Sequence, residues 1–220
     1  AAKALPLETA EAPGEQWLVR VGRDSWSALE GGAGYLAFVG ESFLALLRVV
    51  REPHRIRWRA ILHNVQTAGV DALPITGLLS FLLGIVIAYQ GADQLQRFGA
   101  NIFVADLVGI SMLRELSPMM TAIIIAGRSG SAYTAQIGTM KVTEEIDALR
   151  TIGVGAQELL VLPKVIALVI VMPLLTVYTD VTGVLGGMVM ARSKLDVGFD
   201  VFVDRLDEAV QLSSYWTGLA

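Results

Sequence analysis

Three long apolar runs, at residues 73–90, 102–126 and 157–191, constrain the fold of this chain more than any other feature. A helix of about 20 apolar residues is long enough to cross the hydrocarbon core of a bilayer. Of the 220 residues, 54% are hydrophobic and only 17% are charged, and most charges cluster between the runs. The pattern predicts an all-α polytopic membrane protein.

Several kinds of site are missing from the sequence. It has no cysteine, which excludes disulfides and cysteine-based metal sites. Nothing matches the P-loop of nucleotide-binding proteins, no spacing indicates a nucleophilic triad, and His54 and His63 have no ligand-like neighbours. The net charge of −4 gives no reason to expect nucleic acid. We therefore expect no catalytic residue, cofactor or metal ion in this chain.

The N-terminal third divides into two parts. Residues 1–34 are polar, contain one short strand-like piece at 16–21, and are too few to form a core, so we predict a linker or tail. Residues 35–64 have apolar side chains at helical spacing and then a run of arginines. This pattern predicts an amphipathic interfacial helix and a basic segment in the headgroup plane; the alternative is a solvated helix of a soluble subdomain. The arginines favour a cytoplasmic location for this end.

The three runs differ in how well they fit a membrane. The first reaches only about 27 Å as a helix, so it either spans or dips in and returns, with a polar loop at 91–101. The second reaches about 37 Å and crosses with tilt. The third reaches about 52 Å; we favour one long helix bent near Pro173 over a hairpin around 178–182. The spacing of Gly183 and Gly187 suits close helix packing; the alternative is that these glycines have no contact role. Residues 199–212 form an amphipathic, acidic segment.

The stretch from 111 to 150 is the most informative. Arg114 and Glu115 are adjacent inside an apolar run, where they point about 100° apart on a helix and cannot simply neutralise each other. At least one must find a partner on another helix or face a wet cavity. With Asp106 they are intramembrane ionisable residues, which mark either a functional site or a structural ion pair. Arg128 and Lys164 lie at membrane borders, where we expect them to snorkel.

The second half of this stretch is polar. The small residues at 127–132 permit close backbone approach. An apolar stripe then opposes several charges, among which Lys141 and Glu145 are spaced to pair. We predict a short amphipathic helix that docks onto a cytoplasmic partner.

Three motifs carry a resemblance to a known family. They are LRELSP at 113–118, AGRSGSA at 126–132 and QIGTMKVTEEIDAL at 136–149. Together they resemble the MlaE/YrbE permease family of ABC transporters, and the similarity extends from about residue 48 to 220. Gln136 stands where the family usually has an acidic residue, which puts a charge-dependent contact at this position in doubt.

The resemblance implies an architecture and a function. Residues 65–220 would be the permease domain of a longer protein, stopping as its fourth membrane helix begins, and 1–34 the trailing edge of a STAS-like domain. The permease would form a homodimer in the bacterial inner membrane, with a cytoplasmic ATPase dimer that binds ATP and a periplasmic carrier of the mammalian-cell-entry (MCE) type. It would move phospholipids or related lipids and so support outer-membrane lipid homeostasis.

The resemblance also implies two groups of site residues. The lipid cavity at the dimer interface would be lined by Ile87, Gln94, Leu95, Phe98, Arg114 and Glu115, with Arg114 near the lipid head. The ATPase-coupling helix would present Ala135, Ile137, Gly138, Met140, Lys141, Glu144, Glu145 and Asp147.

Two other functions are compatible with the residues alone. One is an ion- or proton-coupled secondary transporter or channel that uses Asp106, Arg114 and Glu115 as a path. The unbroken amphipathic segment at 127–150 argues against it, because such a protein needs no cytoplasmic docking helix. The other is a structural membrane scaffold.

Overall fold

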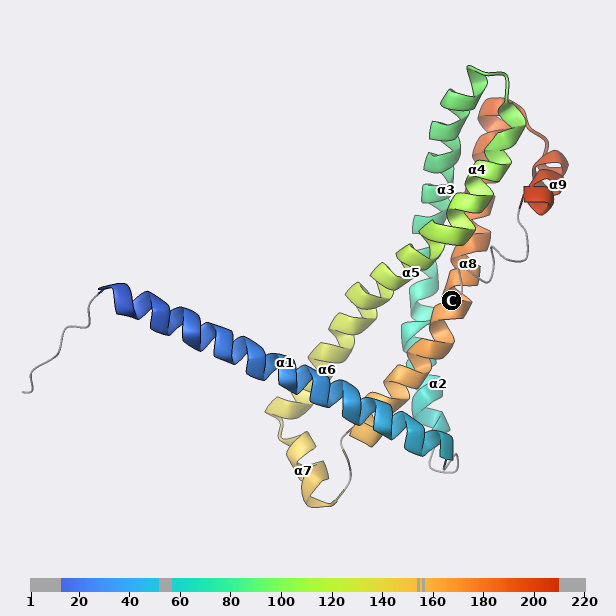
Figure 1. Ribbon diagram of the computed structural model, residues 1–220. Helices are drawn as coiled ribbons and strands as arrows, with labels where there is room; N and C mark the ends of the chain where they lie inside the picture. Colours follow the sequence, from blue (N-terminus) through green and yellow to red (C-terminus); the bar gives the residue numbers. More distant parts are fainter. Residues whose placement is uncertain (1–12, 52–56, 154, 156, 210–220) are drawn as a thin grey trace, which may run out of the picture. The chain divides into compact units, whose positions relative to one another are not determined.

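The computed structural model describes residues 13–51, 57–153, 155 and 157–209, and every regular element in these ranges is a helix (Figure 1). The chain divides into two compact units, Ala1–His54 and Arg55–Ala220. The predicted all-α architecture is confirmed.

The first unit is built on one helix, α1 (Pro13–Arg51). The predicted strand-like piece at 16–21 is wrong, because these residues are helical. An alternation of six residues is a weak signal beside a long stretch of good helix formers with proline only at its start. The helix runs unbroken past residue 35, where we placed the start of the interfacial helix. Its last turn carries Arg48 and Arg51, and their positive charges interact favourably with the negative end of the helix dipole.

Among its described residues, the second unit contains three helices long and apolar enough to cross a membrane: Trp58–Gln96, Asn101–Val142 and Leu159–Leu195. The first comprises α2 (Trp58–Ala68), a 3₁₀ turn (Val70–Ala72) and α3 (Leu73–Gln96). The first apolar run is therefore long enough to span rather than dip. The polar loop predicted at 91–101 is wrong over most of its length, because α3 continues to Gln96 and only a short connection remains, with Gly99 at φ 65°.

The second span is continuous from Asn101 to Val142. A 3₁₀ turn (Asn101–Phe103) leads into α4 (Val104–Ser111), a π-helical turn (Met112–Leu116), α5 (Ser117–Ile124), a second π turn (Ile125–Gly130) and α6 (Ser131–Val142). The close backbone approach expected at 127–132 is not seen at Gly127, whose Cα faces open space within this chain. The short helix α7 (Glu145–Thr151) follows.

The third span is a single helix. A π turn (Gln157–Val161) precedes α8 (Leu162–Leu195), which contains Pro173 and ends at Asp196 in a left-handed conformation. The prediction of one long helix is confirmed and the hairpin alternative is excluded, because residues 178–182 lie inside α8. The amphipathic helix α9 (Phe199–Ala209) comes next, with Phe202 fully buried; the predicted last residues, 210–212, lie outside the described residues.

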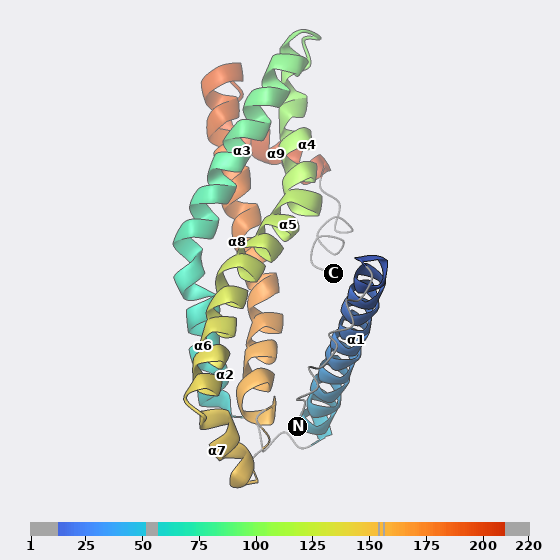
Figure 2. The ribbon, with the colours of Figure 1, turned by 90° about the vertical axis from the view of Figure 1, so that its left-hand side faces the viewer.

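Helices α3 and α8 lie side by side (Figures 1 and 2) because glycines line their contact. A Cβ at Gly84 would collide with the carbonyl of Gly183, and one at Gly187 would collide with Val108. Close packing through small residues is how membrane helices associate without a hydrophobic driving force. Gly183 and Gly187 therefore do have a contact role. The core beside them holds Ala88, Ala92, Val104, Ala105, Val108, Met112, Ala191, Leu195 and Phe202.

Candidate functional site

The two π turns place the charged residues of the second span. Arg114 and Glu115 lie in the first and Arg128 in the second. Pro118 is the second residue after the first turn and has no N–H to donate to the carbonyl of Arg114, four residues earlier. The sequence therefore interrupts the α-helical hydrogen bonds at this point, and π turns of this kind occur frequently at functional sites.

Arg114 and Glu115 point away from the packed interior of the chain. Met112 and Leu113, just before them, and Ser117, just after, are buried, whereas both charged residues are exposed. Within the described part of the chain, neither has an ion-pair partner. The partner that we expected on another helix of this chain is therefore not found among those residues.

The other predicted lipid-cavity residues fall into two groups. Ile87 and Leu95 on α3 are half-buried and pack against the core cluster that contains Met112. Gln94 and Phe98 are exposed, Phe98 with 82% of its surface accessible. The described residues thus bring Ile87 and Leu95 to the core of the second span but do not join all six in one enclosed cavity.

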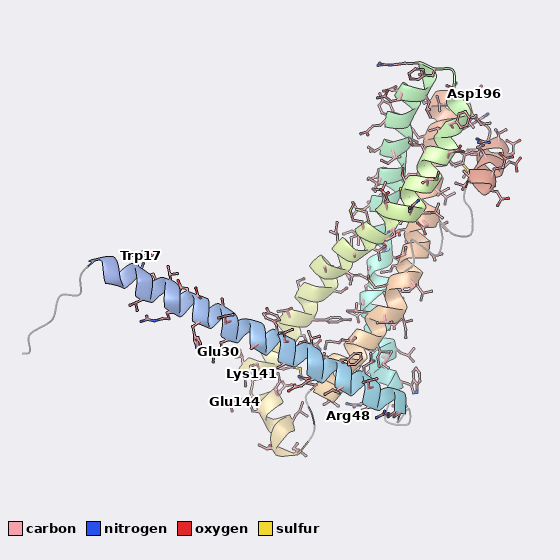
Figure 3. The ribbon with its side chains drawn as sticks, in the orientation of Figure 1. Trp17, Glu30, Arg48, Lys141, Glu144 and Asp196 are labelled. Atoms are coloured by element: carbon pink, nitrogen blue, oxygen red, sulfur yellow. The ribbon has the colours of Figure 1, made fainter. Side chains whose placement is uncertain are left out.

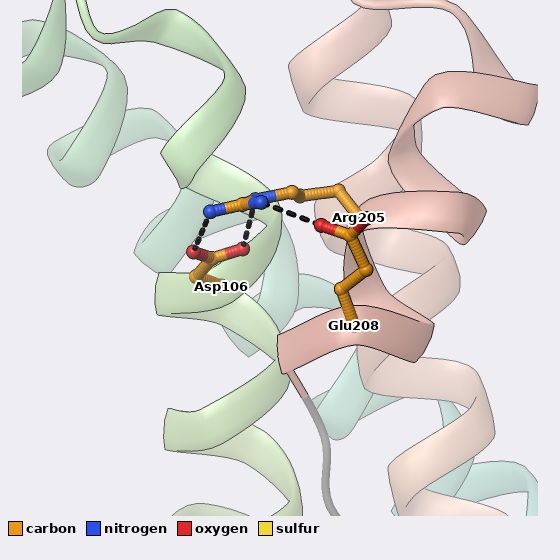
Figure 4. A network of polar contacts seen from close by, with 3 residues as sticks. All are labelled: Asp106, Arg205 and Glu208. Atoms are coloured by element: carbon orange, nitrogen blue, oxygen red, sulfur yellow. Dashed lines mark hydrogen bonds and ion pairs between the residues drawn. The ribbon is translucent and has the colours of Figure 1, made fainter.

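Asp106 has a partner that sequence reasoning missed (Figure 4). The Arg205 guanidinium on α9 donates to both carboxylate oxygens of Asp106, at 3.1 and 3.2 Å, and to Glu208 at 2.6 Å. It also lies over the Phe103 ring, 4.8 Å from its centroid. The hydrogen bonds to Asp106 raise the pKa of Arg205 above its ordinary value. Asp106 is therefore engaged in joining α4 to α9; no local signal could have revealed a pair 99 positions apart.

Asp180 has no role in the sequence analysis. It is 8% exposed on α8 and lies near the buried Ser117, and its Oδ1 has no hydrogen-bond partner within 3.5 Å among the described residues. Asp180 lines a groove of about 270 Å³ whose other walls are apolar, among them Leu113 and Leu206. It is the polar feature of an otherwise apolar surface.

The predicted coupling segment is an elbow of two helices rather than one. Helix α6 ends at Val142, and α7 begins at Glu145 after Glu144 adopts φ 59° (Figure 3). Lys141 pairs across the elbow with Asp147 at 2.9 Å, not with Glu145 as the spacing predicted, because the break ends the helical i,i+4 register. Glu145 instead accepts a hydrogen bond from Thr143 at 3.1 Å.

The elbow exposes most of the residues predicted to couple. Ala135, Gly138, Lys141, Glu144 and Glu145 are exposed, and Ile137, Met140 and Asp147 are half-buried. Val142, at the bend, is 84% exposed, and no residue of α6 is buried. The surface therefore offers apolar and charged groups together, at the same end of the unit as α2 (Figure 2).

Of the two cations predicted to snorkel, Lys164 is buried instead, whereas for Arg128 snorkelling stays a prediction. Lys164 is 7% exposed, and its Nζ lies 5.2 Å from the centroid of the Tyr133 ring. Arg128 is exposed and donates from Nη1 to the Thr67 carbonyl at 3.2 Å. Both cations contact neighbouring helices.

Comparison with known proteins gives a consistent result. A family model described as permease MlaE matches residues 61–220. A probable ABC transporter permease protein of Rickettsia bellii is 36% identical over 162 residues, covering 74% of this chain and 62% of the relative. The intermembrane phospholipid transport system permease protein MlaE of Haemophilus influenzae is 38% identical over 127 residues, covering 58% of this chain and 49% of that protein.

A plant relative extends the comparison. The Arabidopsis thaliana protein TRIGALACTOSYLDIACYLGLYCEROL 1, chloroplastic, is 30% identical over 166 residues, covering 76% of this chain and 47% of that protein. The chain thus spans about three fifths of the Rickettsia relative, at 62%, and about half of the other two, at 49% and 47%.

Proposed function

This chain belongs to the MlaE permease family, and we propose that it is the membrane subunit of an ABC transporter that moves phospholipids or related lipids. A relative named for intermembrane phospholipid transport and others named as ABC transporter permeases support this function. In this proposal the chain is a transport subunit, not an enzyme, and ATP is bound and hydrolysed by a separate ATPase dimer.

The observation that carries the proposal is the exposed pair Arg114 and Glu115 on a π turn within an apolar span. Charged side chains at membrane depth are costly when they face lipid tails, so they face other protein or a wet cavity. We place this face at the contact between two copies of the permease. There the apolar walls, including Ile87 and Leu95, would accept acyl chains, and Arg114 would bind the anionic head.

The elbow of α6 and α7 is the proposed contact with the ATPase. It exposes Val142 at its bend and carries the charges of Lys141, Glu144 and Glu145 beside it. A short helical projection of mixed character suits insertion into a groove of a cytoplasmic protein. The remaining partners are extensions of the same proposal: an MCE-type carrier on the periplasmic side, a STAS domain, location in the bacterial inner membrane and a role in outer-membrane lipid homeostasis.

The alternative of an ion- or proton-coupled path is less well supported. It required Asp106 to be available, whereas Arg205 holds both oxygens of that carboxylate.

The proposal is tested with the full-length permease and its ATPase, copurified and reconstituted in liposomes. We expect a fluorescent phospholipid to move only with ATP, and Arg114→Ala to reduce this movement while the complex stays assembled. The pair of substitutions Glu144→Lys and Glu145→Lys is expected to release the ATPase. Lipid movement driven by an ion gradient without ATP would overturn the function, and unchanged ATPase coupling in the double variant would overturn the docking role.

A further inference from the structure

The second span loses its packing just before the elbow. Ile125 is 7% exposed and packs with Ala72, Val171 and Leu175. Ser129 is 4% exposed and is the last buried residue of this span, since α6 has none. No buried apolar side chain therefore anchors α6, which gives the polar and aromatic contacts at its base a larger share in joining it to the bundle.

Lys164 makes one such contact, between α6 and α8. It lies in the first turn of α8, and its Nζ lies over the ring of Tyr133, in the first turn of α6. Only 7% of the surface of Lys164 is exposed, and no carboxylate among the described residues pairs with it. A cation over an aromatic face gains more when water is excluded, so this contact is the main electrostatic compensation that Lys164 has.

Arg128 makes the second contact, between the π turn and α2. Its Nη1 donates to the carbonyl of Thr67 at 3.2 Å, next to the last residue of α2. The last carbonyls of a helix lack intrahelical partners and carry partial negative charge, so a guanidinium suits this position. Two cations thus connect the base of α6 to the helices on either side.

We infer that Lys164 and Arg128 are positioning residues that transmit movement of the α6–α7 elbow to α8 and α2. This inference rests on the proposed function, because it assigns the path from the ATPase contact to the membrane helices. The cation–π contact between Lys164 and Tyr133 is the central link. Each of the two residues lies in the first turn of its helix, so a displacement of α6 acts directly on the start of α8. Arg128 adds a hydrogen bond at the π turn from which α6 continues.

The test measures lipid moved per ATP hydrolysed by the full-length permease with its ATPase in proteoliposomes. Lys164→Met keeps the apolar stem and removes the charge; we expect the ATPase to stay bound, ATP hydrolysis to continue, and lipid moved per ATP to fall about tenfold. Tyr133→Leu removes the ring from the other side and should give the same loss. Tyr133→Phe, the matched control, keeps the ring and should behave as wild type.

The two losses should not add, because they remove one contact. Lys164→Met combined with Tyr133→Leu is expected to be no worse than either alone, and Arg128→Gln to give a smaller loss. If Lys164→Met does not assemble, Tyr133→Leu, at a half-exposed position, tests the same link. An assembled Tyr133→Leu or Lys164→Met complex with unchanged lipid moved per ATP overturns the inference. A wild-type complex without ATP-driven lipid movement overturns the proposed function instead.

Discussion

The frame of helices around α3 and α8 and the elbow of α6 and α7 are held together in different ways. In the frame, α3 and α8 pack through glycines, and charges are paired between helices, as in Asp106 with Arg205 and Asp93 with Lys194. The elbow has no buried residue in α6 and one exposed pair across its bend. The frame is thus closely packed, whereas α6 contributes no buried residue; in the proposed function, such a loosely packed segment suits a coupling element.

The largest effect is expected from breaking the frame at Gly84. A Cβ there collides with the Gly183 carbonyl, which is backbone and cannot turn aside. Gly84→Val should therefore separate α3 from α8, cost about 3 kcal/mol or more, and sharply reduce the folded protein in membranes. Abundance and the thermal unfolding midpoint measure this.

Gly127→Ala is the matched control for that substitution, because a Cβ at Gly127 meets nothing within 4 Å. It should leave both readouts near wild type. If the two variants were equally abundant, close packing at Gly84 would not be what holds the frame together.

A smaller effect is expected from separating α9 from α4. Asp106→Asn removes the charge that Arg205 contacts, and we expect faster hydrogen exchange in α9 with the three spans still folded. An arginine is charged at neutral and alkaline pH at its ordinary pKa, and Asp106 raises the pKa of Arg205 further. In wild type this protection should therefore not fall between pH 7 and 9. Reversing the pair, with Asp106→Arg and Arg205→Asp, should restore part of the hydrogen-exchange protection of α9. If the reversed pair restored no protection, the burial of Phe202 rather than the ion pair would be what fixes α9.

The smallest effect is expected at the bend of the elbow. Glu144 has φ 59°, which glycine adopts without cost, so Glu144→Gly should leave stability equal or raise it by about 1 kcal/mol. Glu144→Val should lower the unfolding midpoint. A lower midpoint for Glu144→Gly than for Glu144→Val would show that the left-handed turn does not set the bend.

The sequence predicted features that depend on local pattern. Three apolar runs were enough to locate the spans, and the length of the third run favoured one helix. The spacing of Gly183 and Gly187 left close packing and no contact role equally open, and the structure decides for close packing. Prediction from the sequence failed where distant or opposed signals decide. The pairing of Asp106 with Arg205 joins positions 99 residues apart. At Glu144, a left-handed residue separates α6 from α7, although the helical spacing of apolar residues continues past this position.

Lys164 is the clearest case of a residue that local reasoning misplaced. A lysine near a membrane border ordinarily extends to water, and nothing nearby in the sequence indicates the ring of Tyr133, more than thirty positions earlier. The two meet only in the folded chain, where the first turn of α6 places the Tyr133 ring beside Lys164 in the first turn of α8.

We propose that the face carrying Arg114 and Glu115 lines a lipid cavity between two copies of the permease. An electron cryomicroscopy map of the assembled full-length complex in native lipid would show this cavity. We expect acyl-chain density between the two copies of the second span, with a headgroup beside Arg114. Arg114 and Glu115 facing the bulk bilayer, or paired with protein in a dry interface without lipid, would contradict it.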